Sequence, residues 1–561
     1  MTAIARHFAN VGRRQLHYRR GGSGPAVVLL HPSPLSSLTF LPLAETLSKA
    51  FTVFALDRAG YGGSEPLALE APDLGDYADA LEEELDAIGI ESTILYGKST
   101  GSAVALEFAR RYPARVGYLI LENLPVWTKE ERAELTAKYL PSIEAEWDGS
   151  HLLRAWAIER DQQIFWPFFR REAAARRDAD MPGEHAVHDM AMDLLVAGPT
   201  YDLAYRAVFR YEPVSAIQEL TVPTVIAARE GAALLEYLER LPPDAPCSVE
   251  LWPRDAGPHS ERLMQTMQGA KAHVPPPPPR QAEPLSGRVS RTYAGAAGAQ
   301  ILARRRADAK GRPLIMLHRT PRSSASLEPM LCELARSRPV IAIDTPGFGG
   351  SDSLAAGAGS IEALATALEG ALEELAPDGA DIYGMGTGSL IALELALRAP
   401  SRVHRLILEK LPLLPSEVRA ELSERYAVPL NPRWDGTHLL TAWNYVRDGT
   451  FWEPWYERTR ERALKSEPPS PEALQAQVME LLQGADSYEA AYAAAFSYPL
   501  AERLPGLAVP ALVCARPDHF LHEYVDEATA LASTATGCTL PAAADGACEI
   551  FNRFLTGVAV A

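Results

Sequence analysis

Two stretches of the chain have nearly the same sequence and differ at one residue that could do chemistry. Residues 96–109 read "YGKSTGSAVALEFA", and residues 383–396 read "YGMGTGSLIALELA". The first holds Ser99 in a G-x-S-x-G frame, whereas the second has Gly386 at that place. A serine hydroxyl attacks efficiently only when a base takes its proton. A sharp strand-to-helix turn would expose Ser99 for such a reaction. The alternative is a tight turn whose serine is incidental.

The repeat extends along the whole chain. Five pairs of equivalent residues are separated by the same 287 positions: Gly97 and Gly384, Asp57 and Asp344, His31 and His318, Trp147 and Trp434, Pro223 and Pro510. Such a period is far longer than that of a solenoid, so each unit is a whole domain. We expect domains at 1–268 and 289–561. Between them, 269–288 contains five consecutive prolines, which predict a stiff, extended linker that packs in neither domain.

Each copy alternates strand and helix patterns. Continuous apolar runs at 25–31, 51–57, 92–97, 116–122 and 223–229 predict strands buried on both faces of a parallel sheet. Residues 101–113 have helical periodicity and end at a proline. This order predicts an α/β fold, with a doubly wound parallel sheet in each copy. The aromatic-rich segments at about 125–215 and about 412–502 lack strand alternation, and we expect them to form helical caps.

Each copy resembles the α/β-hydrolase superfamily, in the capped subgroup that includes epoxide hydrolases and dehalogenases. The matching motifs are "HPSP" at 31–34, "DRAGYGGS" at 57–64, "GKSTG" at 97–101 and "GPH" at 257–259. The resemblance covers nearly the whole chain, twice. It is strong evidence for the fold and weaker evidence for the activity. In epoxide hydrolases and haloalkane dehalogenases, the residue at this strand-to-helix turn, called the nucleophile elbow, is Asp. Ser99 therefore argues against both of these activities.

The resemblance implies partners for Ser99. Thr100 would give one oxyanion-hole N–H, and Ser33 the second, because Pro32 and Pro34 have no N–H to donate. The alternative for this loop is stiffening by proline for packing. His259 stands where the family's general base resides. In copy two, aligning Gly257 with Gly546 puts Cys548 opposite His259, so that copy lacks both nucleophile and base.

The acid that would orient the base departs from the family pattern. Its usual place, nine residues beyond Pro223, holds Ala232, and the second copy has His519 there. Glu230 lies two residues short of that place. The other known location follows the preceding strand and offers Glu122. We favour Glu122 over Glu230, and a dyad without an acid stays open.

Several further side chains are candidates for the substrate pocket. Residues kept in both copies, such as His151, fit a role in building the cap as well. The aromatic residues of the cap could wall a pocket or pack its core. The expected pocket residues are His31, Trp127, His151, Phe165, Trp166, Phe168 and Tyr211.

Composition limits the remaining functions. The chain has 561 residues, too many for one core, and its net charge of −18 argues against nucleic acid or anionic membrane as partners. Neither a signal peptide nor an apolar run of membrane-spanning length is present in the sequence. The five cysteines have no metal-ligand spacing. We expect a cytoplasmic protein without metal or cofactor.

The sequence thus predicts a serine-dependent hydrolase of ester, lactone, thioester or C–C bonds in a small, mostly apolar molecule. Ser99, His259 and Glu122 would carry the reaction in the N-terminal domain. The C-terminal domain would be degenerate and would serve as the partner in an intramolecular pseudo-dimer. Two alternatives are a lyase or cyclase that acts without an acyl-enzyme, and a non-catalytic protein that binds small molecules.

Overall fold

The computed structural model describes residues 3–270, 275–295, 298–355, 359–465, 467–541 and 544–559. The chain divides into two compact units. The N-terminal unit comprises Met1–Ala282 with Pro432–Thr437, and the C-terminal unit comprises Glu283–Asn431 with His438–Ala561. Each unit is an α/β domain built on its own sheet.

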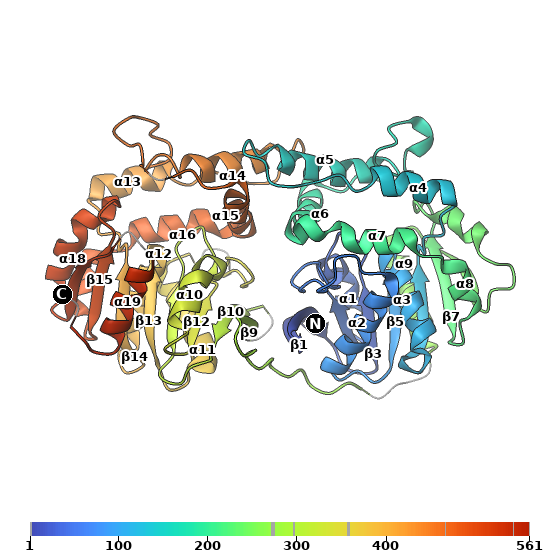
Figure 1. The fold of residues 1–561 in the computed structure, drawn as a ribbon, viewed down its shortest axis with the longest axis horizontal. Coiled ribbons are helices and arrows are strands. Elements are labelled where there is room, and N and C mark those ends of the chain that lie inside the picture. Colours follow the sequence, from blue (N-terminus) through green and yellow to red (C-terminus); the bar gives the residue numbers. More distant parts are fainter. Residues whose placement is uncertain are drawn as a thin grey trace. The chain divides into compact units, whose positions relative to one another are not determined.

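An eight-stranded sheet forms the centre of the N-terminal domain (Figure 1). Its spatial order is β1-β2-β4-β3-β5-β6-β7-β8. The strands are β1 (Ala5–Val11), β2 (Arg14–Gly21), β3 (Ala26–Leu30), β4 (Thr52–Leu56), β5 (Thr93–Lys98), β6 (Val116–Glu122), β7 (Thr224–Arg229) and β8 (Ser248–Trp252). All five residues of β3 and of β4 are buried, as a strand covered on both faces requires.

The sheet is not parallel throughout. Strand β1 pairs antiparallel with β2, and β2 pairs antiparallel with β4, while the pairs from β4 to β8 are parallel. The predicted parallel sheet is therefore extended by an antiparallel edge. The sequence of β2, RQLHYRRG, is mostly polar and gave no apolar run that would reveal it.

Helices cover both faces of this sheet. Helices α1 (Leu41–Leu47) and α9 (Ala256–Gln268) pack on one face over an apolar cluster that includes Val27, Leu29 and Tyr96. Helices α2 (Leu74–Ala87), α3 (Thr100–Arg111) and α8 (Pro213–Gln218) form the other layer. Helix α2 begins with a capping box, in which Asp73 and Asp76 accept each other's backbone N–H.

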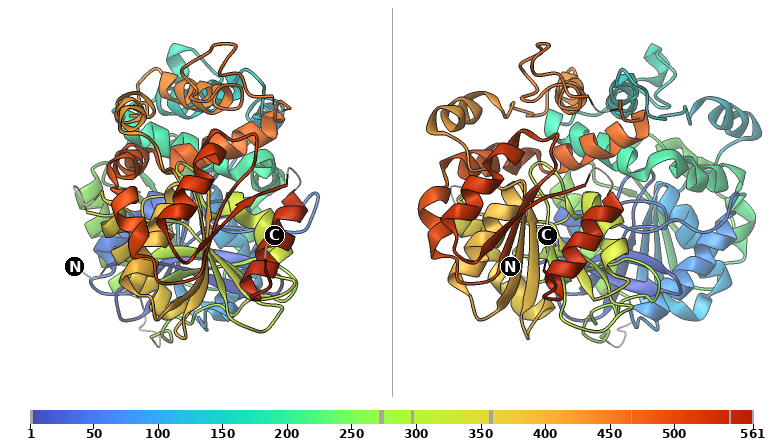
Figure 2. Two further views of the ribbon diagram at one scale, coloured as in Figure 1. Left: turned by 90° about the vertical axis from the view of Figure 1, so that its left-hand side faces the viewer. Right: turned by 60° about the vertical axis from the view of Figure 1, so that its left-hand side comes forward.

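Four helices between β6 and β7 form the cap: α4 (Lys129–Lys138), α5 (Ser150–Ile164), α6 (Glu184–Ala197) and α7 (Asp202–Arg210). They lie over one end of the strands (Figure 1). The two further views show the C-terminal cap helices above their own sheet in the same way (Figure 2). Each domain thus has a sheet, two helical layers and a cap.

The C-terminal domain repeats this topology, with the order β16-β15-β14-β13-β11-β12-β10-β9. Its strands are β9 (Ser290–Ala294), β10 (Ile301–Arg306), β11 (Leu314–Leu317), β12 (Val340–Ile343), β13 (Ala380–Met385), β14 (Val403–Glu409), β15 (Ala511–Ala515) and β16 (Ala535–Thr539). Its sheet-covering helices are α10 (Glu328–Leu334), α11 (Ile361–Leu375), α12 (Thr387–Arg398), α17 (Leu500–Arg503), α18 (Val525–Leu531) and α19 (Ala544–Leu555). Its cap helices are α13 (Ser416–Arg425), α14 (Thr437–Asp448), α15 (Pro471–Gln483) and α16 (Ala485–Ser497).

The proline-rich segment differs from the sequence prediction in one respect. The boundary between the two units falls after Ala282, inside 269–288. However, the Pro277 carbonyl accepts a hydrogen bond of 2.6 Å from Arg20 Nη2 in the N-terminal domain. The expectation that the linker packs in neither domain is therefore wrong at this end, because an arginine on β2 reaches its backbone. Residues 271–274 lie outside the described residues.

Among the described residues, every helix is too short or too polar to span a lipid bilayer.

Candidate active site

Ser99 stands at the turn between β5 and α3, with a backbone that side chains rarely adopt (φ 51°, ψ −119°). A Cβ added at Gly97 would lie 2.4 Å from the Gly101 carbonyl oxygen, and one at Gly101 would lie 2.2 Å from the Leu30 carbonyl oxygen. Both contacts are shorter than any side chain tolerates, so these positions require glycine. The Ser99 N–H donates to the Glu122 carbonyl at 2.9 Å, which fixes the turn to β6.

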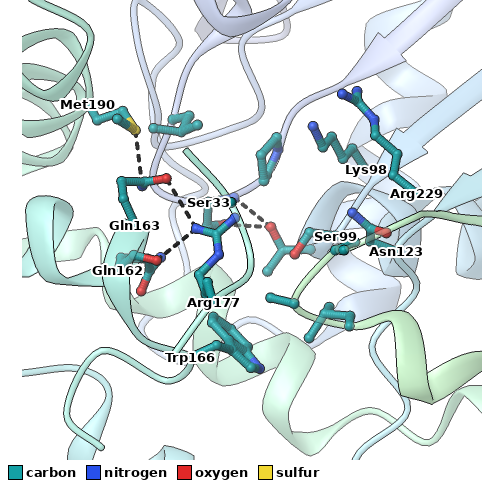
Figure 3. Close-up of a pocket in the computed structure, with 18 of the residues that line it drawn as sticks. Ser33, Lys98, Ser99, Asn123, Gln162, Gln163, Trp166, Arg177, Met190 and Arg229 are labelled. Atoms are coloured by element: carbon teal, nitrogen blue, oxygen red, sulfur yellow. Dashed lines mark hydrogen bonds between the residues drawn. The ribbon is translucent and has the colours of Figure 1, made fainter. Parts of the chain in front are cut away.

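A cavity of about 800 Å³ lies over this turn and is lined by residues of both the sheet and the cap. Ser33, Lys98, Ser99 and Arg229 contribute from the strand ends and loops, and Trp166 and Arg177 contribute from the cap (Figure 3). Such a cavity at the carboxyl ends of parallel strands is where open α/β sheets bind ligands. Ser99 therefore faces a space that could hold a small molecule.

The two residues expected to form an oxyanion hole, Ser33 and Thr100, both line this cavity. However, they form hydrogen bonds with each other. The Ser33 N–H donates to Thr100 Oγ1 at 2.6 Å, and Thr100 Oγ1 donates to Ser33 Oγ at 3.1 Å. The buried Arg58 guanidinium also donates through Nη2 to Ser33 Oγ at 2.7 Å. An oxyanion would have to displace the Thr100 hydroxyl to receive the Ser33 N–H.

Glu122 and His259, the expected acid and base, form a hydrogen bond. His259 lies in the first turn of α9, and its Nε2 is 2.8 Å from Glu122 Oε2. Tyr96 OH donates to the same oxygen at 2.7 Å, and Arg229 Nε donates to Glu122 Oε1 at 2.9 Å. Burial raises the pKa of Glu122, but the Lys98 charge, the His259 hydrogen bond and Arg229 outweigh it and hold this pKa well below its usual range.

Ser99 and His259, in contrast, are not joined. Across the described part of the chain, no hydrogen bond links Ser99 Oγ to His259. Ser99 lines the cavity, whereas His259 is buried beneath it against Trp252, at a ring-centroid distance of 5.6 Å. A general base in a Ser–His–acid triad turns Nε2 to the serine and Nδ1–H to the acid. Here Nε2 faces the acid, so the expected chain of hydrogen bonds is interrupted at the serine.

Of the other expected pocket residues, Trp127 and Trp166 line the cavity. His31 is instead buried beneath the loop, where its Nε2 accepts the Arg58 N–H at 2.9 Å. His318 makes the equivalent bond to the Thr345 N–H at 2.9 Å, which marks a structural role shared by both copies.

The remaining expected pocket residues lie outside the cavity lining. His151 is buried and accepts the Glu146 N–H at 3.1 Å. Phe168 packs on Tyr139 in the cap core, with ring centroids 5.4 Å apart. Phe165 bridges to Arg176 through the backbone. Tyr211 OH donates to Glu107 at 2.9 Å on another surface. These four residues therefore belong to the cap and its supports and not to the cavity wall.

Several charged residues of the cavity lining were missed by the sequence analysis, among them Lys98, Glu159, Arg177 and Arg229. Two of them had a usable signal, since Lys98 lies in the elbow pentapeptide and Arg229 ends a predicted strand at the same sheet edge. Glu159 and Arg177 come from the cap and had none. Glu230 lines the exposed rim and, unlike Glu122, has no bond to His259 among the described residues.

The C-terminal domain keeps the turn and lacks the reactive groups. Gly386 has nearly the backbone of Ser99 (φ 56°, ψ −118°). Tyr383 OH donates to Glu409 at 2.7 Å, as Tyr96 does to Glu122. Cys548 is buried in the apolar cluster that contains Tyr383. The carboxylate on β14 thus persists without a histidine or a nucleophile, which indicates that its counterpart Glu122 also has a structural role.

Groups that could hold a metal ion are absent from the described residues, where no three His, Cys, Asp or Glu side chains cluster suitably.

Comparison with known proteins agrees with the fold. Residues 25–142 and 312–435 match the model of the alpha/beta hydrolase fold family. The chain is 37% identical over 123 residues to pimeloyl-[acyl-carrier protein] methyl ester esterase of Shewanella sp., covering 22% of this chain and 44% of the esterase. It is 27% identical over 253 residues to 2-(acetamidomethylene)succinate hydrolase of Mesorhizobium japonicum, covering 43% of this chain and 84% of that protein.

Among solved structures, epoxide hydrolase A from Mycobacterium thermoresistibile is 20% identical, with a TM-score of 0.39, covering 48% of this chain and 100% of that one. The chain spans only 39% of the length of uncharacterized mycobacterial relatives that it also matches. The two family matches, the two eight-stranded sheets and the two elbows identify a tandem pair of domains with the α/β-hydrolase fold. Two of these relatives are thus named for hydrolytic activities.

Proposed function

We propose that the N-terminal domain is a serine-dependent hydrolase of an ester, lactone, thioester or C–C bond in a small molecule. The observation that carries this proposal is Ser99, held in the strained elbow and facing the cavity. Among the relatives, one is named a methyl ester esterase and another a hydrolase of a succinate derivative, which supports hydrolysis by the same fold. The charged lining of the cavity leads us to drop the mostly apolar substrate that we expected from the sequence.

In this proposal, Ser99 Oγ attacks the carbonyl carbon while its proton passes to His259. The Thr100 and Ser33 N–H groups stabilise the oxyanion, the leaving group takes the proton, and water then releases the acyl group from Ser99. Glu122 stays ionised and orients His259. Turnover requires His259 to turn a ring nitrogen to Ser99, so the substrate-free arrangement must change when substrate binds.

We also propose that the C-terminal domain is a pseudo-hydrolase that serves as a fused partner subunit in a cytoplasmic protein. It has Gly386 in place of Ser99 and Cys548 in place of His259, while its described residues form the same eight-stranded sheet and four cap helices. A copy that keeps its packing after losing its chemistry fits an interaction role.

The test is turnover of p-nitrophenyl acetate and butyrate by the full chain. Ser99→Ala should lower kcat/KM by roughly 10³-fold or more, because it removes the covalent route. Ser142→Ala, a serine of the cap outside the cavity lining, is the matched control and should leave the rate unchanged. Near wild-type turnover by Ser99→Ala would refute the proposed nucleophile.

A second candidate function is a lyase, a cyclase or a binding protein that forms no acyl-enzyme. It is favoured by the missing Ser99–His259 hydrogen bond among the described residues and by the Ser33 N–H that is already bonded to Thr100. In that case, Ser99→Ala would bind ligand normally and no ester in the panel would be hydrolysed by the wild-type chain.

A further inference from the structure

Five cationic side chains line the cavity, and two of them, Arg176 and Arg254, are exposed at its rim. The other three lie deeper. Lys98 ends β5 and Arg229 ends β7, whereas Arg177 comes from the cap (Figure 3). Their charges interact, because Arg229 and Arg177 both act on Lys98. The cations thus share one region between the sheet and the cap.

The protein compensates these charges only in part. Glu122 is bonded to Arg229 at 2.9 Å, and it lies 3.9 Å from Lys98 Nζ, beyond hydrogen-bond distance. Arg177 has no carboxylate within ion-pair distance among the described residues. Its Nη1 donates to neutral acceptors, the Gln162 carbonyl at 2.8 Å and Gln163 Oε1 at 3.1 Å. Its Nε is buried without a hydrogen-bond partner among the described residues.

The acidic residues of the lining do not cancel the excess. Asp178 is already paired with Arg254 at 2.7 Å, and Asp180, Glu230 and Asp255 are exposed at the rim. Burial, and then the charge of Asp193, raise the pKa of Glu159 to about 8, so its carboxyl group is largely neutral at pH 7. The inner cavity therefore keeps a positive charge.

Holding these cations away from water costs free energy. Burial lowers the pKa of Lys98 and of Arg177, and the charges of Arg229 and Arg177 lower the pKa of Lys98 further while Glu122 raises it. An anion placed between them would offset this cost, and a guanidinium can hold a carboxylate through two parallel hydrogen bonds.

The second copy shows which of these charges accompany the serine. At the same 287-residue offset, Met385 replaces Lys98 and Leu464 replaces Arg177. The backbone is equivalent, since the Arg177 N–H donates to the Ile164 carbonyl at 2.8 Å and the Leu464 N–H to the Phe451 carbonyl at 2.7 Å. The fold of this loop therefore does not require a cation. We infer that the role of Arg177 is in the cavity.

We propose that the N-terminal cavity takes a substrate bearing a carboxylate or a similar compact anionic group, which Lys98 and Arg177 hold while Ser99 meets the bond to be cleaved. This inference rests on the proposed function, because it places the anion in the cavity that Ser99 lines. It assigns substrate specificity to two residues that take no part in breaking the bond.

The experiment uses two probes that differ in one charge, monoethyl succinate and diethyl succinate. Their binding to full-length Ser99→Ala protein is measured by isothermal titration calorimetry, so that neither ester is consumed. We expect the half-ester to bind at least about tenfold more tightly, the increment of a charge-assisted hydrogen bond. In the same background, Lys98→Met and Arg177→Leu, the residues of the second copy, should each remove most of that preference. Arg171→Gln, an exposed arginine outside the lining, should not.

Equal binding of the two esters, or no measurable binding of the half-ester, would overturn the proposal. So would an unchanged preference in both cavity variants. The two esters are also compared in Ser99→Ala protein without a further substitution. The proposal can therefore be refuted even if Lys98→Met or Arg177→Leu fails to fold. Failure of the proposed function gives a different result: the wild-type chain would prefer the half-ester in binding and hydrolyse neither probe.

Discussion

The Glu122 carboxylate is buried among side chains that fix both its position and its charge. Tyr96 and His259 bond one oxygen and Arg229 bonds the other, while Lys98 lies nearby. The second copy keeps the tyrosine bond to Glu409 and has Arg516 at the position of Arg229, whereas Met385 and Cys548 stand in place of Lys98 and His259. The lysine and the histidine are therefore the features particular to the N-terminal domain. Glu122 therefore has two roles: it stabilises this edge of the sheet, and it compensates part of the positive charge in the cavity.

Replacing Glu122 with Gln should strongly destabilise the N-terminal domain. Removing one partner of a buried ion pair leaves the other charge uncompensated and costs about 3 to 5 kcal/mol. Tyr96→Phe, which removes one hydrogen bond to the same carboxylate, should cost only about 0.5 to 1.5 kcal/mol. The urea midpoint, followed by tryptophan fluorescence, measures both. Similar midpoints for the two variants would contradict the ion-pair assignment.

The same variant has a defined pH signature. The folded pKa of Glu122 lies below its ordinary 4.5, so its contribution to stability is present above pH 4.5 and is lost as pH falls below that value. Below pH 4.5, the urea midpoint of Glu122→Gln should therefore change less with pH than the midpoint of the wild type.

Gly386 shows how far a single residue could be interpreted from sequence. Its φ of 56° suggests that glycine relieves strain, but Ser99 adopts a φ of 51° at the equivalent turn. The fold therefore accepts a side chain there, and loss of the hydroxyl is a change of chemistry rather than of backbone. The neighbourhood differs slightly, since the Arg319 Cβ would lie 3.1 Å from a Cβ added at 386.

At the scale of elements, apolar runs identified the buried strands to within one or two residues. The run at 51–57 became β4 (Thr52–Leu56), and the run at 92–97 became β5 (Thr93–Lys98). Strand β2 was missed because its Arg and His residues interrupt the pattern. The cap cations were missed because Arg177 lies between helices, where no period relates a residue to the cavity. Periodicity reveals burial, whereas a site depends on contacts between distant elements.

Helices α5 and α6 carry a pair of buried acids with a measurable consequence. Glu159 on α5 is 3% exposed, and burial together with the Asp193 charge on α6 raises its pKa to about 8. Between pH 4.5 and 8 the unfolded chain loses this proton while the folded chain keeps it, so stability falls as pH rises, by up to about 1.4 kcal/mol per pH unit. Glu159→Gln should reduce the slope and be more stable than wild type at pH 8, while Asp193, whose pKa burial raises to about 7, keeps a smaller slope below that pH.

The measurement is the urea midpoint between pH 5 and 9. Glu130→Gln, an exposed glutamate on α4, serves as the matched control and should keep the wild-type slope. A slope unchanged in Glu159→Gln would show that this carboxyl group is ionised in the folded state at neutral pH.

At the scale of the whole molecule, the proposed pseudo-dimer predicts that the two halves stay together without a covalent link. A protease site placed between Ala282 and Glu283 would cut the chain at the boundary of the two units. After cleavage we expect the halves to co-elute with the uncut chain on size-exclusion chromatography, because the degenerate domain keeps its complete fold. Halves that separate while the N-terminal half stays folded and active would contradict the proposal.

The central claim is that the chain has two equivalent strand-to-helix turns and that only the first, at Ser99, carries a nucleophile. Intact-mass spectrometry after treatment with a fluorophosphonate tests it most directly, because this reagent marks a serine that has been activated as a nucleophile. We predict a single adduct, mapped to the peptide that contains Ser99 and absent from folded Ser99→Ala. A folded wild-type chain that gains no adduct, or gains one that persists in Ser99→Ala, would contradict the account.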